Sequence, residues 1–454
     1  MSDTVTAVDR YIAEHLPEFI DDLRRLVRVP SVAATGEAME EAATLVAELL
    51  GGAGLTSTIM ASDGFPLVYA DSGTSSTRTL ICYNHYDVQP PEPLALWESP
   101  PFAPEEHNGR LYGRGVSDDK GQLLARIAAV RAVRAVTGGL PARVKFLVEG
   151  EEEIGSGSLP GFIARHQALL AADACVWENG GVDAVGRPTV ILGKRGVLCV
   201  ELRVRTLTRD AHSGQAHNLP NAAWRLVGAL STLRDVHEHI RIAGFYDAVR
   251  PPTAVERQLL ERMPSDEAFA REHYGVAAFV EDHTGWEYVA AVYQPTANLA
   301  GIGAGWQGSG SKTVIPATAT AKLDFRLVPK QDPHDILAKL RRHLDTEGYS
   351  DVEVVQLGGA EPAATTPAND PFVRLTARTA AQVYGKPAVL VPLTGGSGPL
   401  HTFRAVLKTP IVTLGTADPY VNLHAPNESL SLAQFTLGTR HMARLLLAFG
   451  AAQP

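Results

Sequence analysis

The strongest constraint on the fold is an alternation of short apolar runs with helical patterns through residues 57–177. Residues 79–84 and 143–148 are apolar runs of strand length, and residues 122–136 between them repeat apolar side chains at helical spacing. Another apolar run, at 173–177, follows a predicted helix at 159–170. Strands that alternate with helices predict an α/β fold, with a mostly parallel sheet and helices on both faces.

The pattern changes near Arg195. Residues 198–205 and 317–327 alternate strictly between apolar and polar side chains, as half-exposed antiparallel strands do. With predicted helices at 221–233 and 334–344, residues 196–362 are expected to form a smaller α+β domain with an antiparallel sheet. Buried α/β character then resumes, and 454 residues exceed the size at which single cores stop growing. Residues 1–195 and 363–454 are therefore predicted to form one larger domain that carries the smaller one as an insertion.

Outside the inserted region we predict one long helix at 6–28, a second at 37–50, and short strands at 57–60 and 67–70. The net charge of −9 and the scattered basic residues argue against nucleic acid or an anionic membrane as a partner. The three cysteines, Cys82, Cys175 and Cys199, lie in apolar runs without a CxxC pair, which predicts a reducing compartment. Since neither a signal-peptide pattern nor a membrane-length apolar run is seen, we expect a cytoplasmic protein.

Metal-competent side chains follow four predicted strands. These are His85 and Asp87, the acidic run 149–153, Glu178, and, beyond a loop, His424. Each has a structural explanation on its own, such as a solvated loop, and Asp118 and Asp119 before the helix at 122 resemble a helix N-cap. Parallel strands, however, bring their carboxyl ends to one edge of a sheet. Together these residues predict a convergent site.

Oxygen and imidazole donors without cysteine suit a catalytic Zn, Mn or Co site rather than a structural zinc. Two divalent ions could be held if one carboxylate bridges them, and a further glutamate would then serve as general base. The five candidate ligands are His85, Asp118, Glu153, Glu178 and His424.

The sequence resembles the dinuclear zinc exopeptidase and deacylase family, which includes carnosine dipeptidases, glutamate carboxypeptidase, aminoacylase and succinyl-diaminopimelate desuccinylase. The resemblance runs from residue 26 to the last predicted helix, and the order and spacing of the motifs agree. The motifs are Asn84-His85-Tyr86-Asp87-Val88, Tyr112-Gly113-Arg114-Gly115, Asp118-Asp119-Lys120-Gly121, the run 149–156, Ala211-His212-Ser213-Gly214, Lys312-Thr313-Val314-Ile315-Pro316, the run 325–329, and Gly395-Gly396-Ser397.

The resemblance implies that Asp118 bridges two zinc ions. It places His85 and Glu178 on one ion and Glu153 and His424 on the other. In relatives the peptide bond between the paired acids is cis.

For catalysis, the resemblance makes Glu152 the general base and Asp87 the acid that orients His85. His212 resembles a histidine that reaches from the lid of one subunit into the active site of its dimer partner. A surface residue at a turn is the other explanation for His212.

Substrate contacts also follow from the resemblance. Arg326 resembles an arginine that binds the substrate carboxylate, and Gly396 and Ser397 lie in a loop that offers hydrogen bonds to the substrate. We expect a homodimer through the inserted lid and dimerisation domain, with edge strands such as 198–205 packing across its axis.

Two departures from the family pattern bear on the substrate. Thr394 stands where dipeptidase relatives usually have arginine or another larger residue, and Glu178 is more typical of carboxypeptidase-like and acylase-like members. The inserted domain, with Gly244-Phe245-Tyr246-Asp247, resembles the dipeptidase branch over a longer stretch. We therefore predict a dinuclear zinc metallopeptidase that cleaves dipeptides or small peptides next to a free carboxylate. An N-acyl or N-carbamoyl amino acid amidohydrolase, or a carboxypeptidase, with the same site is the alternative.

Overall fold

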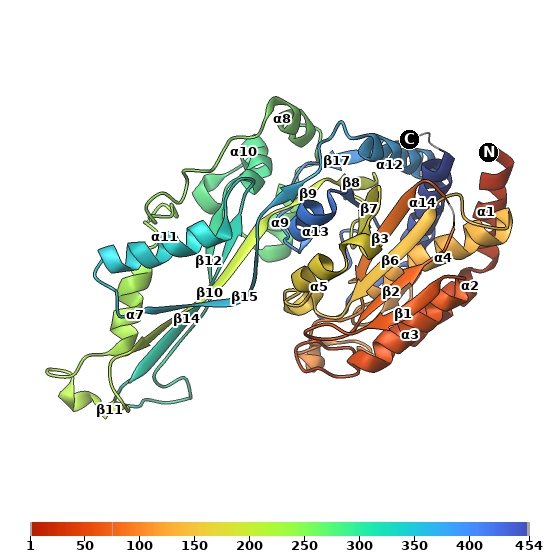
Figure 1. Cartoon of the computed structure of the whole chain (residues 1–454). Coiled ribbons are helices and arrows are strands. Elements are labelled where there is room, and N and C mark those ends of the chain that lie inside the picture. The colour runs from red at the N-terminus through yellow and green to blue at the C-terminus, as the bar shows by residue number, and fades with distance from the viewer. Residues whose placement is uncertain (1, 75, 452–454) are drawn as a thin grey trace.

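The computed structural model describes residues 2–74 and 76–451 (Figure 1). An eight-stranded sheet forms the centre of the larger part of the molecule. Its middle strands β6, β3, β7 and β18 run parallel, and β1 and β2 are antiparallel at one edge. At the other edge β17 and β8 are parallel to each other, and β8 is antiparallel to β18. In order across the sheet the strands are β1 (Thr56–Met60), β2 (Leu67–Asp71), β6 (Arg143–Glu149), β3 (Thr79–His85), β7 (Ala174–Trp177), β18 (Ile411–Thr413), β8 (Thr189–Ile191) and β17 (Val389–Val391).

Helices cover both faces of this sheet, as predicted, because successive residues of its strands point to opposite sides. Leu80 and Cys82 of β3 belong to the apolar core on one face, whereas Ile81 and Tyr83 belong to the core on the other. The first face packs against α1 (Ser2–Glu14), α2 (Leu16–Val27), α3 (Met39–Gly52), α4 (Lys120–Thr137), α12 (Pro371–Tyr384) and α14 (Leu432–Ala451). The second packs against α5 (Leu159–Arg165), α6 (Gln167–Leu170) and α13 (Leu400–Leu407).

Two predicted helices are each divided in the structure. The single helix expected at 6–28 is wrong, because the chain leaves helical geometry at His15 and restarts with Pro17 in the first turn of α2. Proline is tolerated there because first-turn N–H groups have no intrahelical partner. The helix expected at 159–170 is likewise interrupted at His166, whose φ of −117° and ψ of 26° are not helical. Among the described residues, no helix is both long and apolar enough to cross a membrane.

One buried arginine ties the carboxyl ends of three strands together. Arg126 of α4 donates through Nη1 to the Tyr83 carbonyl (2.7 Å) and to Asn84 Oδ1 (2.8 Å). Its Nη2 donates to the carbonyls of Trp177 and Leu414, the latter at 3.1 Å. The ends of β3, β7 and β18 are thereby held in register at the edge of the sheet where the polar residues lie.

The inserted region contains a four-stranded antiparallel sheet, as predicted. β10 pairs with β14 over ten residues, and alternate residues of β10 are buried under two helices, α7 and α11. In sheet order the strands are β12 (Thr296–Ala304), β14 (Thr318–Leu327), β10 (Gly196–Arg205) and β15 (Glu353–Glu361), and the helices are α7 (Ala222–Ser231) and α11 (Pro333–Thr346).

The expectation that 198–205 is an edge strand is wrong, because β10 lies between β14 and β15. The edges are β15 and β12, and β12 was not predicted from the sequence. Its residues, Thr-Ala-Asn-Leu-Ala-Gly-Ile-Gly-Ala, are poor in the β-branched and aromatic side chains typical of strands.

Smaller elements connect the two parts. β9 (Gly193–Lys194) pairs with β16 (Ala364–Thr365), so the two chain segments that pass between the sheets lie side by side. A three-stranded sheet of β19 (Ser429–Ser431), β5 (Arg110–Tyr112) and β4 (Glu105–His107) joins the loop before α4 to the loop after β18. Short helices α8 (Ala254–Leu260), α9 (Glu267–Tyr274) and α10 (Gly285–Ala290) precede β12, and β11 (Ala211–His212) pairs with β13 (Val314–Ile315).

Candidate active site

Asp118 lies at the centre of a cluster of acids and histidines. Its Oδ1 is 3.1 Å from His85 Nε2, and its Oδ2 is 3.3 Å from His424 Nε2. His424 Nε2 also lies 3.2 Å from Glu153 Oε2. Burial opposes ionisation of Asp118, but the hydrogen bonds with His424 and His85 outweigh it and lower the pKa of Asp118. Each oxygen of Asp118 thus faces a different imidazole, which is the arrangement expected of a bridging carboxylate.

Four separate elements bring these side chains together. His85 ends β3, Asp118 lies in the loop before α4, Glu153 lies in the 3-10 turn Glu152–Ile154 after β6, and His424 lies in the loop before β19. The peptide bond between Asp118 and Asp119 is cis, as the family resemblance implies. His85 and Glu153 lie at or just after the carboxyl ends of parallel strands, and Asp118 directly precedes the helix packed on them, so the sheet and this helix bring these three residues together.

Asp119 occupies the N-cap position of α4, but its side chain makes no capping hydrogen bond. Its Oδ2 accepts instead from Asn84 Nδ2 at 2.6 Å and from the His85 backbone N–H at 3.2 Å. Burial raises the pKa of Asp119 to about 7. Asp119 thus stands at the N-cap position, as the sequence suggested, but its side chain supports the chain around His85 instead of capping the helix.

Asp87 contacts both the histidine and the glutamates. Its Oδ1 lies 3.3 Å from His85 Nδ1, and its two oxygens accept from the backbone N–H groups of Glu152 (3.3 Å) and Glu153 (2.9 Å). The side chain is fully buried. It is placed to fix the ring orientation of His85, the part that the resemblance assigns to it.

Glu178 lies outside the groups of three close donors found among the described residues, which are His85, Asp118 and Asp119, and Asp118, Glu153 and His424. Its Oε1 accepts from Trp177 Nε1 (2.7 Å) and Lys194 Nζ (2.5 Å). Its Oε2 is buried without a hydrogen-bond partner in the described structure. A buried carboxylate oxygen without a partner is costly unless something else binds it, so this atom is available to a metal ion.

Sequence reasoning missed Lys194, Asn179 and Glu428. Asn179 Nδ2 donates to Asp118 Oδ1 at 3.0 Å, and the Glu428 carboxylate accepts from the Asp118 backbone N–H at 3.0 Å. Asn179 directly follows a predicted ligand, Glu178, which is a signal that could have identified it. Neither Lys194 nor Glu428 has such a local signal.

Glu152 lies in the same 3-10 turn as Glu153 and lines the cavity beside the cluster. Burial raises the pKa of Glu152, the neighbouring carboxylates of Glu178 and Glu153 raise it further, and His85 partly opposes the shift. A carboxylate with a raised pKa is a stronger base than an ordinary glutamate, which suits a group that accepts a proton and returns it.

The cluster opens into a cavity of about 580 Å³ between the ends of the large sheet and the inserted sheet. Arg326 of β14 lines this cavity, and its Nη1 donates to Ser397 Oγ at 3.0 Å. Ser397 Oγ in turn donates to the Gly196 carbonyl at 3.1 Å, and Gly396 also lines the cavity. The structure therefore brings all three predicted substrate contacts to the acidic cluster.

His212 is not brought to this cavity. It is exposed on β11, which lies at the far tip of the inserted region from the large sheet (Figure 1). Its Nδ1 accepts from the Gly214 backbone N–H at 2.9 Å. Within one chain, His212 and the acidic cluster are separate.

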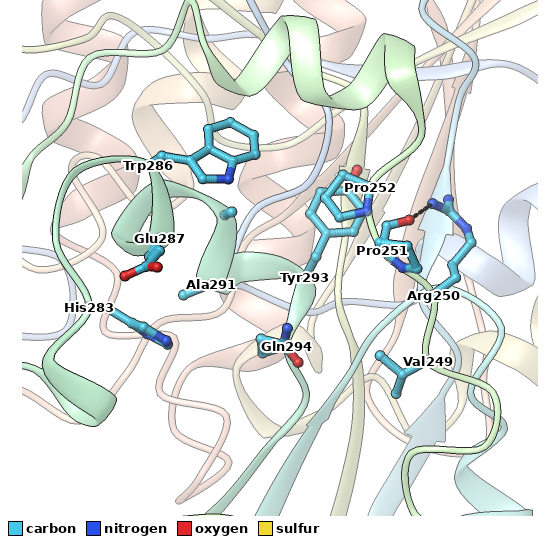
Figure 2. Close-up of a pocket in the computed structure, with 11 residues that line it drawn as sticks. Val249, Arg250, Pro251, Pro252, His283, Trp286, Glu287, Ala291, Tyr293 and Gln294 are labelled. Carbon is cyan, nitrogen blue, oxygen red and sulfur yellow. Dashed lines mark hydrogen bonds between the residues drawn. The ribbon is translucent and has the colours of Figure 1, made fainter.

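A second cavity, of about 370 Å³, shares no lining residue with the first. Figure 2 shows Trp286, Tyr293, Pro251 and Pro252 around it, with Arg250 donating to the Pro251 carbonyl. The Arg250 guanidinium is further paired with Glu256 at 2.7 Å. This lining is mainly apolar and aromatic and contains no member of the acidic cluster.

The residues of the cluster fit divalent metal ions. There are two groups of three donor residues, and within each group the donor atoms lie within 4.8 Å of one another. Every donor is a carboxylate oxygen or an imidazole nitrogen. The buried Glu178 Oε2, which has no hydrogen-bond partner in the described structure, adds a further donor. Such donors suit catalytic transition-metal sites. An α/β sheet with this cluster at its strand ends and an antiparallel insertion above it defines a metal-dependent hydrolase.

Comparison with known proteins identifies the family. Residues 81–448 match peptidase family M20/M25/M40, and the chain belongs to this family of metallopeptidases. The Beta-Ala-His dipeptidase of Mus musculus is 28% identical, over 96% of this chain and 94% of the relative. The cysteinylglycine-S-conjugate dipeptidase of Corynebacterium striatum is 28% identical, over 90% of each chain. The crystal structure of the M20 family metallo-carboxypeptidase Sso-CP2 from Sulfolobus solfataricus is similar with a TM-score of 0.92 and 35% identity, over 96% of this chain and all of that one. The family predicted from the motifs is thereby confirmed.

Proposed function

We propose that this protein is a metal-dependent dipeptidase that cleaves the amide bond next to the free carboxylate of a dipeptide or small peptide. One observation carries the proposal. The acidic cluster and the Arg326 guanidinium line the same cavity, so a carboxylate held by Arg326 would place the adjacent amide beside the cluster. The dipeptidases among the relatives support the same substrate class.

We assign two divalent ions to the site, with zinc as the native metal and manganese or cobalt as the alternatives that these donors accept. His85, Asp118 and Glu178 would hold one ion, and Asp118, Glu153 and His424 the other. When bound, the ions polarise the substrate carbonyl and lower the pKa of water.

The protein's own residues then carry the proton and hold the substrate. A Glu152 carboxylate oxygen accepts the proton of the attacking water and later delivers it to the leaving nitrogen. Arg326 holds the terminal carboxylate, and the loop of Gly396 and Ser397 offers hydrogen bonds to the substrate backbone. Asp87 keeps the His85 ring in one orientation throughout.

The substitution Glu152→Gln tests this assignment. We expect turnover to fall by about 10²–10⁴-fold, the usual contribution of a positioned acid or base, while two metal ions per chain remain bound. Metal content by mass spectrometry and turnover of a dipeptide are measured on the same sample. Near wild-type turnover with two ions bound would show that Glu152 is not the base.

A carboxypeptidase is the second candidate, because the similar Sso-CP2 structure is described as one. A substrate panel separates the candidates. Preferential hydrolysis of dipeptides supports the proposal, removal of C-terminal residues from longer peptides favours a carboxypeptidase, and cleavage of N-acetyl, N-succinyl or N-carbamoyl amino acids favours a deacylase.

We further propose a homodimer in which His212 completes the active site of the partner as an oxyanion donor. The distance of β11 from the acidic cluster within one chain supports this arrangement. Leu299 and Ile302 of the edge strand β12, at 46% and 52% exposure, and Trp224 of α7, at 75%, are large exposed apolar side chains of the inserted region, which association would bury.

Mixing two inactive variants, His212→Ala and Glu152→Ala, tests the shared site. A mixed dimer would contain one site that lacks both groups and one intact site, so activity should return after subunit exchange. Continued inactivity, with exchange verified by a tag, would exclude a contribution of His212 across the dimer.

A further inference from the structure

Glu428 is a buried carboxylate whose hydrogen bonds all go to the loop that carries Asp118. Only 1% of the residue is exposed. Its Oε2 accepts from Arg114 Nη1 and the Gly115 backbone N–H, both at 2.8 Å. Its Oε1 accepts from the backbone N–H groups of Ser117 (2.9 Å) and Asp118 (3.0 Å). The loop from Arg114 to Asp118 is therefore folded around one carboxylate.

This arrangement requires a carboxylate rather than an amide. Each oxygen accepts two hydrogen bonds, and all four donors are N–H groups that cannot accept. A glutamine would turn its NH₂ group toward two of these donors. Gly115 completes the turn with a φ of +81°, where a side chain would also meet Val88.

Glu428 also lies in the same segment as His424, which precedes it by four residues. Strand β19 begins directly after Glu428, and its Ser429 pairs with Tyr112 of β5. The Gly113 backbone N–H donates to the Glu428 carbonyl at 3.0 Å. The His424 loop and the Asp118 loop are therefore joined through both the main chain and the side chain of Glu428.

We infer that Glu428 is a positioning residue for the metal site, which sets the place of Asp118 relative to His424. Two ligands of one ion must be held at a fixed separation, and Glu428 is the residue whose side chain and main chain both connect the His424 loop to the Asp118 loop. The inference rests on the proposed function, since it takes Asp118 and His424 as ligands. Glu428 itself lies behind the loop and does not line the cavity.

The test compares Glu428→Gln with Asp418→Asn. Asp418 pairs with Arg110 at 2.7 Å in the same region of the chain, and its described hydrogen bonds go to Arg110 and the Tyr420 backbone N–H rather than to residues 114–118, so it is a matched control for the loss of a carboxylate. Zinc affinity is measured at each position by competition with a coloured chelator, and cobalt spectra report the ligand geometry.

We expect Glu428→Gln to weaken one of the two zinc positions by about 10–100-fold, the usual cost of losing a partner that orients a ligand, and to alter the cobalt spectrum. Asp418→Asn should leave both affinities and the spectrum near wild type. Equal effects of the two variants, or unchanged zinc affinities in Glu428→Gln, would overturn the inference.

If Glu428→Gln does not fold, Glu428→Asp replaces it. The shorter carboxylate keeps the charge but cannot reach all four donors, so one zinc position should still weaken, and wild-type affinity at both positions would overturn the inference. Wild-type protein that binds no zinc would instead refute the proposed function, because that result does not involve Glu428.

Discussion

The two halves of the proposed metal site differ in how the fold holds them. The buried half consists of His85 and Glu178 together with Asp118, which both halves share. His85 ends β3, Glu178 directly follows β7, and both residues are fully buried. The open half, Glu153 and His424 with Asp118, lies on a short 3-10 turn and a loop, and the His424 side chain is 53% exposed.

This difference indicates two ways to prepare a ligand. In the buried half, core strands tied by Arg126 fix the donors, so little ordering remains for a metal to impose. In the open half the backbone is irregular, and its geometry depends on polar contacts from Asp87 and Glu428. We therefore expect the open half to bind its ion more weakly and to exchange it faster.

The largest effect should come from the residue that both halves share. Asp118→Ala removes a ligand from both proposed ions and leaves His85 and His424 without their common partner. We expect both ions to be lost and activity to fall by more than the roughly 100-fold upper cost of losing an outer partner. Metal content and turnover are measured together, and retention of two tightly bound ions would show that Asp118 does not bridge.

His424→Ala should separate the halves. It removes the exposed donor only, so the protein should keep one ion per chain, held by His85 and Glu178, while activity is lost. His85→Ala is the counterpart in the buried half, because it removes the imidazole that lies beside Asp118 and Asp119. If His424→Ala empties both positions, the buried half is not an independent site.

Chelation of the unaltered protein should show the same order with a smaller effect. Because His424 is half-exposed and its neighbours lie on loops, a chelator should remove one ion quickly and the second slowly. The time course of metal transfer to a coloured chelator measures both phases. A single phase that releases two ions would contradict the difference in accessibility between the halves.

The sequence could identify most of the cluster because apolar strands end at its members. The run predicted as a strand at 79–84 ends beside His85, and the run at 143–148 ends beside the acidic residues, so local patterns were sufficient to place them at one edge. A local pattern also predicted the antiparallel insertion, because the side chains of β10 alternate between buried and more exposed positions.

The remaining contacts depend on tertiary structure that no local pattern encodes. Lys194 reaches Glu178 from β9, on a chain crossing between the two sheets, and Glu428 reaches Asp118 over a separation of 310 residues. In the sequence each is a charged residue beside a loop. Strand β12 was missed because its pairing with β14, rather than its own side chains, makes it a strand.

The smallest effect concerns Lys194, the cation within the buried half. Its ammonium holds Glu178 Oε1 together with Trp177, so only Oε2 is presented to a metal ion. In Lys194→Met, Glu178 Oε1 keeps only the Trp177 donor. The substitution also removes a positive charge that repels a divalent ion. We expect zinc to bind the buried half a few-fold more tightly and to leave it more slowly, whereas Lys194→Arg, which keeps the charge, should remain close to wild type. Competition with a coloured chelator measures both variants. Weaker zinc binding in Lys194→Met would mean that the lysine supports the ligand more than its charge opposes the ion, and the buried half would then depend on a side-chain contact as the open half does.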